Sequence, residues 1–302
     1  MIAKAEPREH MRRKRDAYWS DLVGGVTGRY KTEQVAGLLA GRDLPAGSAV
    51  VDVGAGTSAL SKMVAELCGL QQIICVDYDE AIVRNGRAAE TDPQVEWRAA
   101  DARDLAAWTD RVGAVTFFDI LHELYSFVGR SGDDPAVDHA AGRAAVEEAL
   151  TAAASLLAPG GVIVITDDVL PEEEVSVRVA CDREEIATLV RRIEREYRSR
   201  PLEIRWLDDR AFEIPSRTLI TLLTHYNKPK AGDEARWAVE QMEVHEYMKV
   251  SEYDAFLRSV GLTPSVVVGT PDEALEEWRA DFRIVDGLAD FPAKRVAVVA
   301  VR

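Results

Sequence analysis

The sequence is poor in cysteine and has no cysteine pattern typical of a disulfide framework or a zinc site. Its 302 residues include three cysteines, Cys68, Cys75 and Cys181, and no Cys-x-x-Cys pair. An odd number of widely spaced cysteines argues against both kinds of site. Cys68 and Cys75 stand in apolar surroundings, where cysteine acts as a small core residue.

Long apolar stretches are also missing. No run approaches eighteen uninterrupted apolar residues, and the first ten residues, MIAKAEPREH, lack the apolar segment of a secretion signal. We therefore expect a cytoplasmic protein without a membrane partner.

Positive charge is in short supply. The chain has 37 Lys and Arg against 52 Asp and Glu, a net charge of -15, so it should repel polyanions such as nucleic acid and anionic membrane. One basic stretch, REHMRRKR at residues 8–15, departs from this balance. It fits either a phosphate-binding arm or a solvated amphipathic helix, and we favour the helix because nothing else extends the basic patch.

What the sequence does contain is a hydrophobic fraction of 47% and an alternation of short apolar runs with amphipathic stretches. The runs are typical of buried parallel strands, and the stretches between them have apolar positions spaced by three and four, as helices do. The predicted strands are SAVVDVG, QIICVDY, VEWRAAD, GAVTFFD and GGVIVITDD. This order predicts a doubly wound α/β sheet.

The alternation stops after the fifth strand and returns near the end of the chain. We predict an N-terminal helical lid at residues 1–48, a cofactor-binding core at 49–169 and an inserted helical substrate cap at 170–250. Residues 251–302 would then complete the core with strands 6 and 7, PSVVVGT and AKRVAVVAVR. An insertion at this position would fold over the carboxyl ends of the strands, where open α/β sheets bind ligands.

A glycine turn follows the first strand. Gly54, Gly56 and Ala59 satisfy G-x-G-x-x-[GA], which also suits nicotinamide and flavin sites. Asp52, two residues before the first glycine, distinguishes between these ligands and a cationic one. Its carboxylate would repel the pyrophosphate of a dinucleotide, whereas it would attract a ligand with an ammonium group and a sulfonium centre.

Asp52, Gly54, Ala55 and Gly56 resemble the first motif, [DE]-x-G-x-G, of the class I S-adenosylmethionine-dependent methyltransferases. The resemblance implies S-adenosylmethionine as the cofactor and a Rossmann-like sheet of seven mostly parallel strands. It also implies that the last strand, AKRVAVVAVR, lies antiparallel beside the fifth, a feature that dinucleotide-binding folds normally lack.

The same resemblance assigns further cofactor contacts. Asp77, which closes the second strand, would bind the ribose hydroxyls, and Tyr78 would lie against the adenine. Asp101 and Ala102 would read the adenine edge, and Asp119 would lie in the loop beside the transferred methyl group. Asp77 would equally suit NAD, and any one of these carboxylates has the simpler alternative role of a strand-end cap.

Catalytic candidates follow the fourth and fifth strands. His122 and Glu123 stand in FDILHELYSF, and Asp167 stands before Asp168 in ITDDVLPEEE. His122 has a suitable intrinsic pKa for removing a proton from the methyl acceptor, or it hydrogen-bonds without taking one. Our prediction names no metal ligand, but Asp167 and Asp168 together with Asp119 or His122 leave a divalent metal open.

Aromatic and histidine side chains of the N-terminal segment, of the loop after the fourth strand and of the cap are candidates for binding the substrate. They suit a pocket with apolar walls and a few polar groups, and some of them must instead form the core of the cap. The candidates are Tyr18, Tyr30, Tyr125, Trp206, His225 and Tyr226. His245 and Tyr247 belong to the same mixture.

These features together predict a methyltransferase that acts on an oxygen, nitrogen or activated carbon of a small molecule, for instance one of secondary metabolism. The alternatives are an RNA or protein methyltransferase, a catalytically silent cofactor-binding subunit, and an NAD-dependent oxidoreductase. The expected partner is a small-molecule substrate rather than nucleic acid, and the sequence is compatible with a homodimer.

Overall fold

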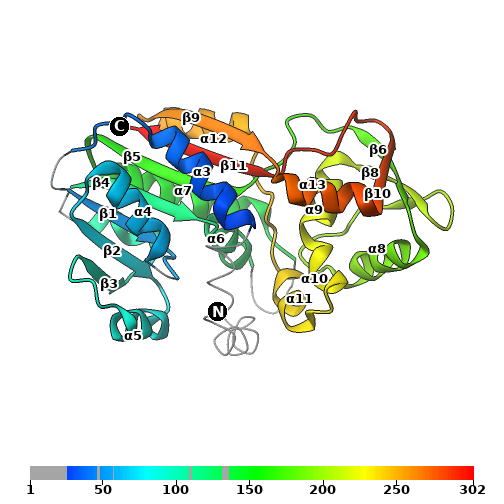
Figure 1. Ribbon diagram of the computed structural model, residues 1–302, viewed down its shortest axis with the longest axis horizontal. Coiled ribbons are helices and arrows are strands. Elements are labelled where there is room, and N and C mark those ends of the chain that lie inside the picture. Colours follow the sequence, from blue (N-terminus) through cyan, green and yellow to red (C-terminus); the bar gives the residue numbers. More distant parts are fainter. Residues whose placement is uncertain (1–25, 46–47, 57, 109–110, 131–135) are drawn as a thin grey trace.

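A computed structural model describes residues 26–45, 48–56, 58–108, 111–130 and 136–302 of the chain. The basic stretch at residues 8–15 and the substrate-binding candidate Tyr18 lie outside these ranges. The described residues form two lobes, a larger one on the left of Figure 1 and a smaller one on the right.

The larger lobe is built on a seven-stranded sheet in the order β3-β2-β1-β4-β5-β11-β9. Strands β1 to β5 run parallel, and β11 lies antiparallel between β5 and β9. The strands are β1 (Ala49–Val53), β2 (Gln72–Asp77), β3 (Val95–Ala99), β4 (Val112–Phe118), β5 (Leu157–Asp168), β9 (Thr263–Gly269) and β11 (Arg295–Val301). This arrangement confirms the predicted fold, including the antiparallel last strand.

Both faces of this sheet are buried, which explains why its strands are nearly continuous apolar runs. Val51 and Val53 of β1 belong to one core cluster, and Val50 between them belongs to the cluster on the opposite face. One face is covered by α3 (Val26–Leu39), α4 (Ala59–Cys68) and α5 (Glu80–Ala89). The other is covered by η1 (Ala102–Ala107), α6 (Leu121–Val128), α7 (His139–Leu156) and α12 (Val250–Ser259).

Only part of the predicted N-terminal lid is described, namely α3. Its Val35 and Leu39 are buried in the core cluster of the sheet, and the helix packs beside β11, β9 and α4. The helix therefore forms part of the core layer, and its Lys31 extends to the carboxyl edge of the sheet through an ion pair with Asp119.

The smaller lobe, which we call the cap, contains a sheet that the sequence did not predict. Four antiparallel strands lie in the order β10-β6-β8-β7, and the cap has its own hydrophobic core. The strands are β6 (Ser176–Cys181), β7 (Arg205–Trp206), β8 (Ala211–Pro215) and β10 (Phe282–Asp286). The helices are α8 (Glu184–Glu196), α9 (Ser216–His225), α10 (Asn227–Lys230), α11 (Glu234–Glu240) and α13 (Asp272–Asp281).

The predicted division at residue 250 needs correction, because the cap takes elements from both sides of it. Strand β10 pairs antiparallel with β6, and Phe282 lies opposite Cys181. Trp278 of α13 and Phe282 are buried in the core of the cap, which explains why the chain leaves the large sheet between β9 and β11. The cap is thus a mixed α and β lobe formed by two separate parts of the chain.

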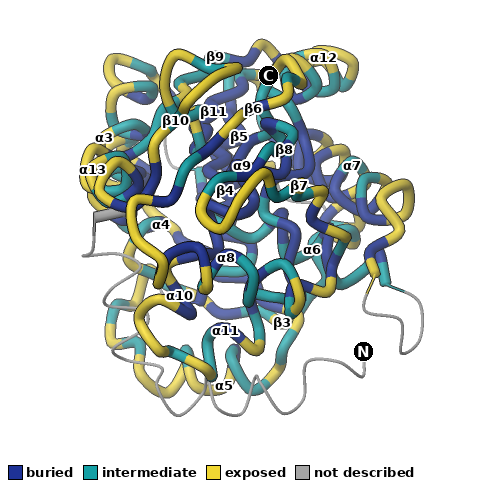
Figure 2. The backbone as a smooth tube through the Cα atoms, turned by 90° about the vertical axis from the view of Figure 1, so that its right-hand side faces the viewer, coloured by how far each residue is buried: buried dark blue, intermediate teal, exposed yellow. Residues whose placement is uncertain are grey.

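Burial follows this two-lobed plan. Figure 2 shows buried backbone in the strands of the interior and exposed backbone in the outer loops and helix surfaces. Among the described residues, no helix is both long and apolar enough to cross a bilayer.

An irregular segment at residues 241–249, which we call the linker, leads from α11 of the cap to α12 of the core. It is held against α6, because the Val244 amide donates to Ser126 Oγ at 2.8 Å. Tyr247 also stacks on Tyr125 of α6 with ring centroids 4.7 Å apart. The linker therefore carries its side chains to the carboxyl edge of the large sheet.

Candidate active site

The glycine turn joins β1 to α4 at the carboxyl edge of the sheet. Gly54 and Gly56 have φ of 68° and 51°, a conformation that glycine adopts with little strain. A β-carbon at Gly54 would lie 2.3 Å from Ile120 Cγ1, so this position also requires glycine for space. The Gly54 amide donates to the Val76 carbonyl oxygen at 2.7 Å, which fixes the turn beside β2.

Asp52 lies directly below this turn and is 2% exposed. Thr116 Oγ1 of β4 donates to its Oδ1 at 2.6 Å. Burial raises the pKa of Asp52 to about 7, although hydrogen bonds from Thr116 and Ser61 act in the opposite direction. A buried carboxyl group that still titrates near neutral pH is well suited to receive a cationic ligand.

The other predicted cofactor residues occupy the neighbouring strand ends. Asp77 ends β2 and is buried, and its Oδ1 accepts a hydrogen bond from the Asp79 amide at 2.8 Å. Tyr78, next in the chain, is 47% exposed. Asp101 caps η1, which begins at Ala102, and hydrogen bonds from Arg103 lower the pKa of its carboxyl group. Together with Asp52 these residues follow one edge of the sheet, as the sequence predicts.

Asp119 has a different environment from the one expected of a cofactor contact. Its carboxylate pairs with Lys31 at 2.7 Å and with Arg295 of β11, and both cations are buried. Burial alone would raise the pKa of Asp119, but Arg295 and Lys31 hold it well below its usual range. Arg295 also donates to Asp168 at 2.6 Å. The charge of Asp119 is thus balanced by two buried cations of the protein itself, and its predicted contact with the cofactor stays a prediction.

His122 and Asp167 form a close pair, 45 residues apart in sequence. His122 Nδ1 lies 2.7 Å from Asp167 Oδ1, and the His122 amide donates to Asp167 Oδ2 at 3.0 Å. Asp167 therefore fixes both the start of α6 and the orientation of the imidazole ring. Burial would lower the pKa of His122, but the carboxylate of Asp167 raises it. This pairing leaves Nε2 as the ring nitrogen available for chemistry.

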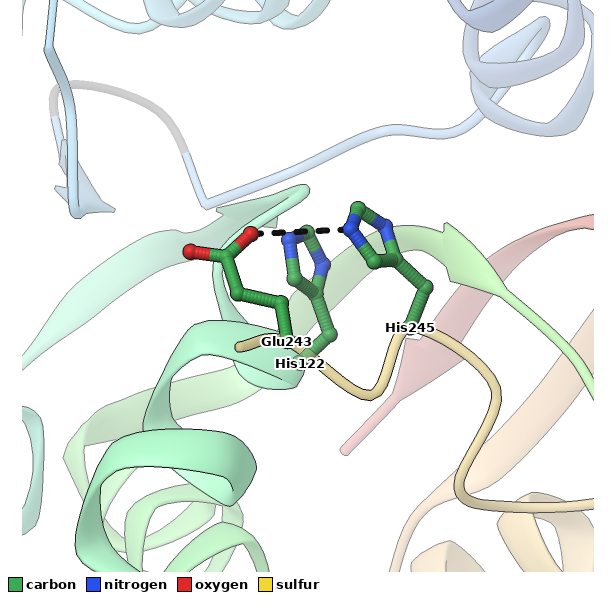
Figure 3. Close-up of side chains that lie close together, drawn as sticks. All are labelled: His122, Glu243 and His245. Carbon is green, nitrogen blue, oxygen red and sulfur yellow. Dashed lines mark ion pairs between the residues drawn. The ribbon is translucent and has the colours of Figure 1, made fainter. Parts of the chain in front are cut away.

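The linker adds a second histidine to this pair. The ring of His245 stacks on His122 with centroids 4.1 Å apart, and Figure 3 shows both rings beside Glu243. His245 Nε2 lies 3.0 Å from Glu240 Oε2 and 3.5 Å from Glu243 Oε2. Burial would lower the pKa of His245, but the surrounding carboxylates raise it well above its usual value.

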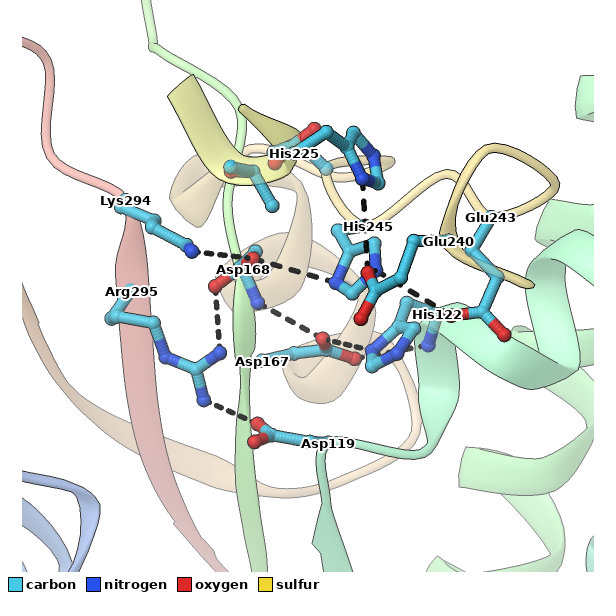
Figure 4. A network of polar contacts seen from close by, with 12 residues as sticks. Asp119, His122, Asp167, Asp168, His225, Glu240, Glu243, His245, Lys294 and Arg295 are labelled. Atoms are coloured by element: carbon cyan, nitrogen blue, oxygen red, sulfur yellow. Dashed lines mark hydrogen bonds and ion pairs between the residues drawn. The ribbon is translucent and has the colours of Figure 1, made fainter. Parts of the chain in front are cut away.

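His225, at the end of α9, completes the cluster from the cap. It is 0% exposed, and its ring lies 5.0 Å from that of His245 in an edge-on arrangement. Burial, His245 and Lys228 lower the pKa of His225 well below its usual value, so the ring is neutral. Figure 4 shows this network at the end of β5, where the cap and the linker meet the large sheet.

Other predicted site residues have packing roles in the structure. Tyr226 is buried in the cap, where its hydroxyl donates to Asp281 at 2.6 Å. Trp206 packs against Phe212 on the cap sheet. Tyr226 is thus part of the core of the cap, and Trp206 is half-buried beside it, so their predicted contacts with the substrate stay predictions. Tyr30 of α3 lies against Gly269 of β9.

Two predicted residues remain close to the cluster without joining it. Tyr125 of α6 is buried, and its hydroxyl lies 2.5 Å from His139 Nδ1. Glu123 follows His122 in α6 and is half-buried.

Comparison with known proteins decides between the ligands that a glycine turn can bind. A family model described as a methyltransferase domain matches residues 50–128. This range contains the glycine turn, Asp77, Asp101 and His122. The chain carries a class I S-adenosylmethionine-dependent methyltransferase domain. The predicted enzyme class and cofactor are thereby confirmed.

Solved structures share the fold of this methyltransferase. An S-adenosylmethionine dependent methyltransferase from Mesorhizobium loti superposes with a TM-score of 0.51 and 16% identity, covering 92% of this chain and 100% of that one. A complex of the Haloferax volcanii Trm112 methyltransferase activator with its proposed methyltransferase superposes with a TM-score of 0.50 and 14% identity. This match covers 95% of this chain and 94% of that one. No curated protein matches the chain in sequence. At these identities the likeness is one of fold.

Several residues of this methyltransferase site were missed in the sequence. Glu240 and Glu243 join His245, and Lys31 and Arg295 balance Asp119. The spacing Glu-x-x-Glu-x-His at residues 240–245 was the available signal for the first group. Lys31 and Arg295 carried no comparable signal, because they are 88 and 176 residues from Asp119.

Proposed function

We propose that this methyltransferase transfers the methyl group of S-adenosylmethionine to an oxygen, nitrogen or activated carbon of a small molecule. The acceptor binds where the linker and the cap meet the carboxyl edge of the large sheet.

The observation that carries this proposal is the convergence of polar side chains from three separate parts of the chain. His122 follows β4, Asp167 ends β5, and Glu243 and His245 lie in the linker. Loops at the carboxyl ends of the strands are where open α/β sheets bind ligands, and the glycine turn lies at the same edge. Cofactor and acceptor groups are therefore served by adjacent strand ends.

The cap and the overall charge favour a small acceptor. The cap contributes His225 to the cluster, so part of the site is enclosed by a second lobe. A net charge of -15 repels the phosphates of RNA, which argues against nucleic acid as the acceptor. Enclosure with a few polar groups is typical of sites for small molecules.

Methyl transfer is an in-line displacement, so the protein must align the acceptor with the sulfonium carbon and exclude water. In this proposal Asp52 stabilises the cationic end of the cofactor at the turn. Asp167 fixes the ring of His122, and the His122 Nε2 faces the acceptor.

The proposal is tested by supplying the enzyme with S-adenosylmethionine that carries a labelled methyl group. Separate reactions receive the small-molecule, RNA and protein fractions of the source organism. We expect label in the small-molecule fraction, and we expect its loss when Asp52→Ala replaces the wild type. Label confined to RNA or to protein would refute the small-molecule assignment.

A further inference from the structure

The cluster around His245 contains two overlapping groups of residues with metal-ligating side chains. One group is His122, Glu243 and His245, and the other is His225, Glu240 and His245. Within each group, the ligand atoms all lie within 4.8 Å of one another. His245 belongs to both groups, so it lies at the centre of the cluster.

Two distances from His245 suit neighbouring ligands of an ion. The Nε2 atom of His245 lies 3.0 Å from Glu240 Oε2 and 3.5 Å from Glu243 Oε2. Donor atoms at roughly 2.0–2.2 Å from a shared ion lie about 3.0–3.6 Å from one another. The histidine and carboxylate atoms are therefore already spaced as neighbouring ligands would be.

Carboxylates behind the histidines provide a second, independent observation. Asp167 Oδ1 lies 2.7 Å from His122 Nδ1, and Asp168 Oδ2 lies 3.6 Å from His245 Nδ1. In both cases a carboxylate faces the ring nitrogen that points away from the cluster. The 2.7 Å contact of His122 is the arrangement of metal-ligating histidines, in which the carboxylate fixes the ring and increases the basicity of the other nitrogen. The longer contact of His245 is an ion pair.

His225 provides a third observation, because ion pairing alone does not account for it. This side chain is 0% exposed, and neither of its ring nitrogens has a hydrogen-bond partner among the described residues. Its Nδ1 lies 3.7 Å from Glu240 Oε2, beyond hydrogen-bond distance. A buried polar group without a partner is costly, and His245 Nε2 likewise has no hydrogen-bond partner among the described residues, so a bound ion would satisfy it.

Lysine and arginine side chains also contact the cluster, and they limit which of its carboxylates can bind a metal ion. Lys228 lies 3.2 Å from Glu240 Oε2, and Arg236 lies 3.0 Å from Glu240 Oε1. Lys294 lies 3.6 Å from Asp168. These contacts account for the charge of Glu240 and Asp168, whereas Glu243 forms an ion pair with His245 and with no other described residue.

We propose that this cluster binds one divalent transition-metal ion, with His245 Nε2 as the central ligand. His122 and Glu243 complete its ligand set, because Glu240 of the second group is already paired with Lys228 and Arg236. Imidazole and carboxylate donors suit Zn²⁺, Fe²⁺, Mn²⁺ and Co²⁺ rather than Mg²⁺ or Ca²⁺, which prefer oxygen alone.

One consequence rests on the proposed function. An ion here lies beside the acceptor, where it polarises an oxygen or nitrogen bound to it. His122 then serves as a metal ligand rather than as the proton acceptor that the sequence suggests. Metal binding itself is measured without turnover, so failure of the metal site and failure of the proposed function are separate results.

The experiment uses the full-length protein without a polyhistidine tag. Its metal content is measured by plasma mass spectrometry, and chelator-treated protein is then titrated with Co²⁺ while its visible absorption is recorded. We expect close to one equivalent of bound Co²⁺ with ligand-field bands. Absence of both a co-purified ion and Co²⁺ bands at equal concentrations of protein and ion would overturn the proposal.

Variants locate the ion. We expect His245→Gln to weaken Co²⁺ binding at least about 100-fold and Glu243→Gln about 10-fold. His139→Gln is the matched control, because His139 lies outside both groups, and its affinity should stay within about twofold of wild type. Far-UV circular dichroism shows whether each variant is folded. If His245→Gln does not fold, the Co²⁺ affinity of Glu243→Gln provides the test. Unchanged Co²⁺ affinity in Glu243→Gln would overturn the assignment.

Discussion

Asp52 is buried, and we propose that its carboxyl group binds the cationic end of the cofactor. Burial disfavours the charged form that this role requires, so the proton of the carboxyl group must be exchangeable. Removal from water raises the pKa of its carboxyl group to about 7. Below this pH the group is neutral in the ligand-free protein, and above it the group is charged. A cationic cofactor favours the charged form, so cofactor binding should release a proton near neutral pH.

The affinity for S-adenosylmethionine should therefore depend on pH through Asp52. Between pH 6 and pH 8 the ionised fraction rises from about a tenth to about nine tenths, so we expect affinity to rise about 10-fold. In Asp52→Asn the affinity at pH 8 should fall, and the rise with pH should disappear. Calorimetric titration at several pH values measures both. An equal rise in wild type and variant would show that Asp52 is not the titrating group.

His122 should affect turnover more than cofactor binding. Its ring is held by Asp167 where β4 and β5 end, whereas the predicted adenine contacts follow β2 and β3, on the other side of β1 and its glycine turn. We expect His122→Ala to leave affinity for S-adenosylmethionine within about twofold and to lower kcat by about 10²–10⁴-fold. Single-turnover methyl transfer to the identified acceptor is the measurement. A wild-type kcat in this variant would remove His122 from the reaction.

Asp119 should matter for stability, because two buried cations depend on it. Asp119→Asn keeps a side chain that tolerates the φ of 53° but leaves Lys31 and Arg295 with less compensation. Breaking such a buried pair typically costs about 3–5 kcal/mol, and the remaining Asp168 contact reduces this to about 2–4 kcal/mol. Urea unfolding measures the free energy.

The control for Asp119→Asn is Asp290→Asn, which breaks an exposed pair with Arg279. An exposed pair contributes less than about 1 kcal/mol. Equal losses in the two variants would mean that the buried cluster does not stabilise the fold.

At the scale of single residues, the sequence predicted the positions of those candidate residues that belong to a local sequence motif. Asp52, Asp77 and Asp101 stand at strand ends next to their motifs, so each could be placed by counting. Lys31, Arg295 and Glu243 come from distant parts of the chain and meet only through tertiary packing. Their roles depend on which strand lies beside which, and one sequence does not encode that locally.

At the scale of elements, the glycine turn depends on the loop that follows β4. Gly54 needs glycine both for its φ of 68° and for its approach to Ile120. We expect Gly54→Ala to lower the free energy of unfolding by about 2–4 kcal/mol, since a left-handed conformation alone costs about 1–2 kcal/mol in a residue with a β-carbon. Cofactor affinity should fall as well, because the turn must shift.

Gly160→Ala is the matched control for Gly54→Ala. Gly160 has a φ of +79°, but a β-carbon there would meet nothing within 4 Å. Its cost should therefore be the backbone term of about 1–2 kcal/mol alone, with unchanged cofactor affinity. Chemical denaturation compares the two. Similar losses in both variants would show that the contact with Ile120 is unimportant.

The elements of the large sheet were predictable because parallel strands buried on both faces are continuous apolar runs. The strands of the cap are less distinct. Residues 176–181, SVRVAC, alternate between buried and exposed positions, and β7 has only two residues. Strand β10 lies about a hundred residues from its partner β6, so its pairing had no local signal. The cap was therefore predicted as helical.

At the scale of the whole molecule, the two lobes contribute different residues to the candidate site. The predicted cofactor residues of the core lie along the carboxyl edge of the large sheet. The cap and the linker bring His225, Glu243 and His245 to the same edge. This network of polar contacts joins the two lobes, so the position of the cap affects the geometry of the candidate site. In the proposed function, the cap would thereby help to enclose the acceptor.

The most direct test of this account is calorimetric titration of the wild-type protein with S-adenosylmethionine and, separately, with NADH at pH 8. The account predicts saturable binding of one S-adenosylmethionine per chain and no detectable heat from NADH, because the Asp52 carboxylate attracts a cation and repels a pyrophosphate. Saturable NADH binding without affinity for S-adenosylmethionine would contradict it.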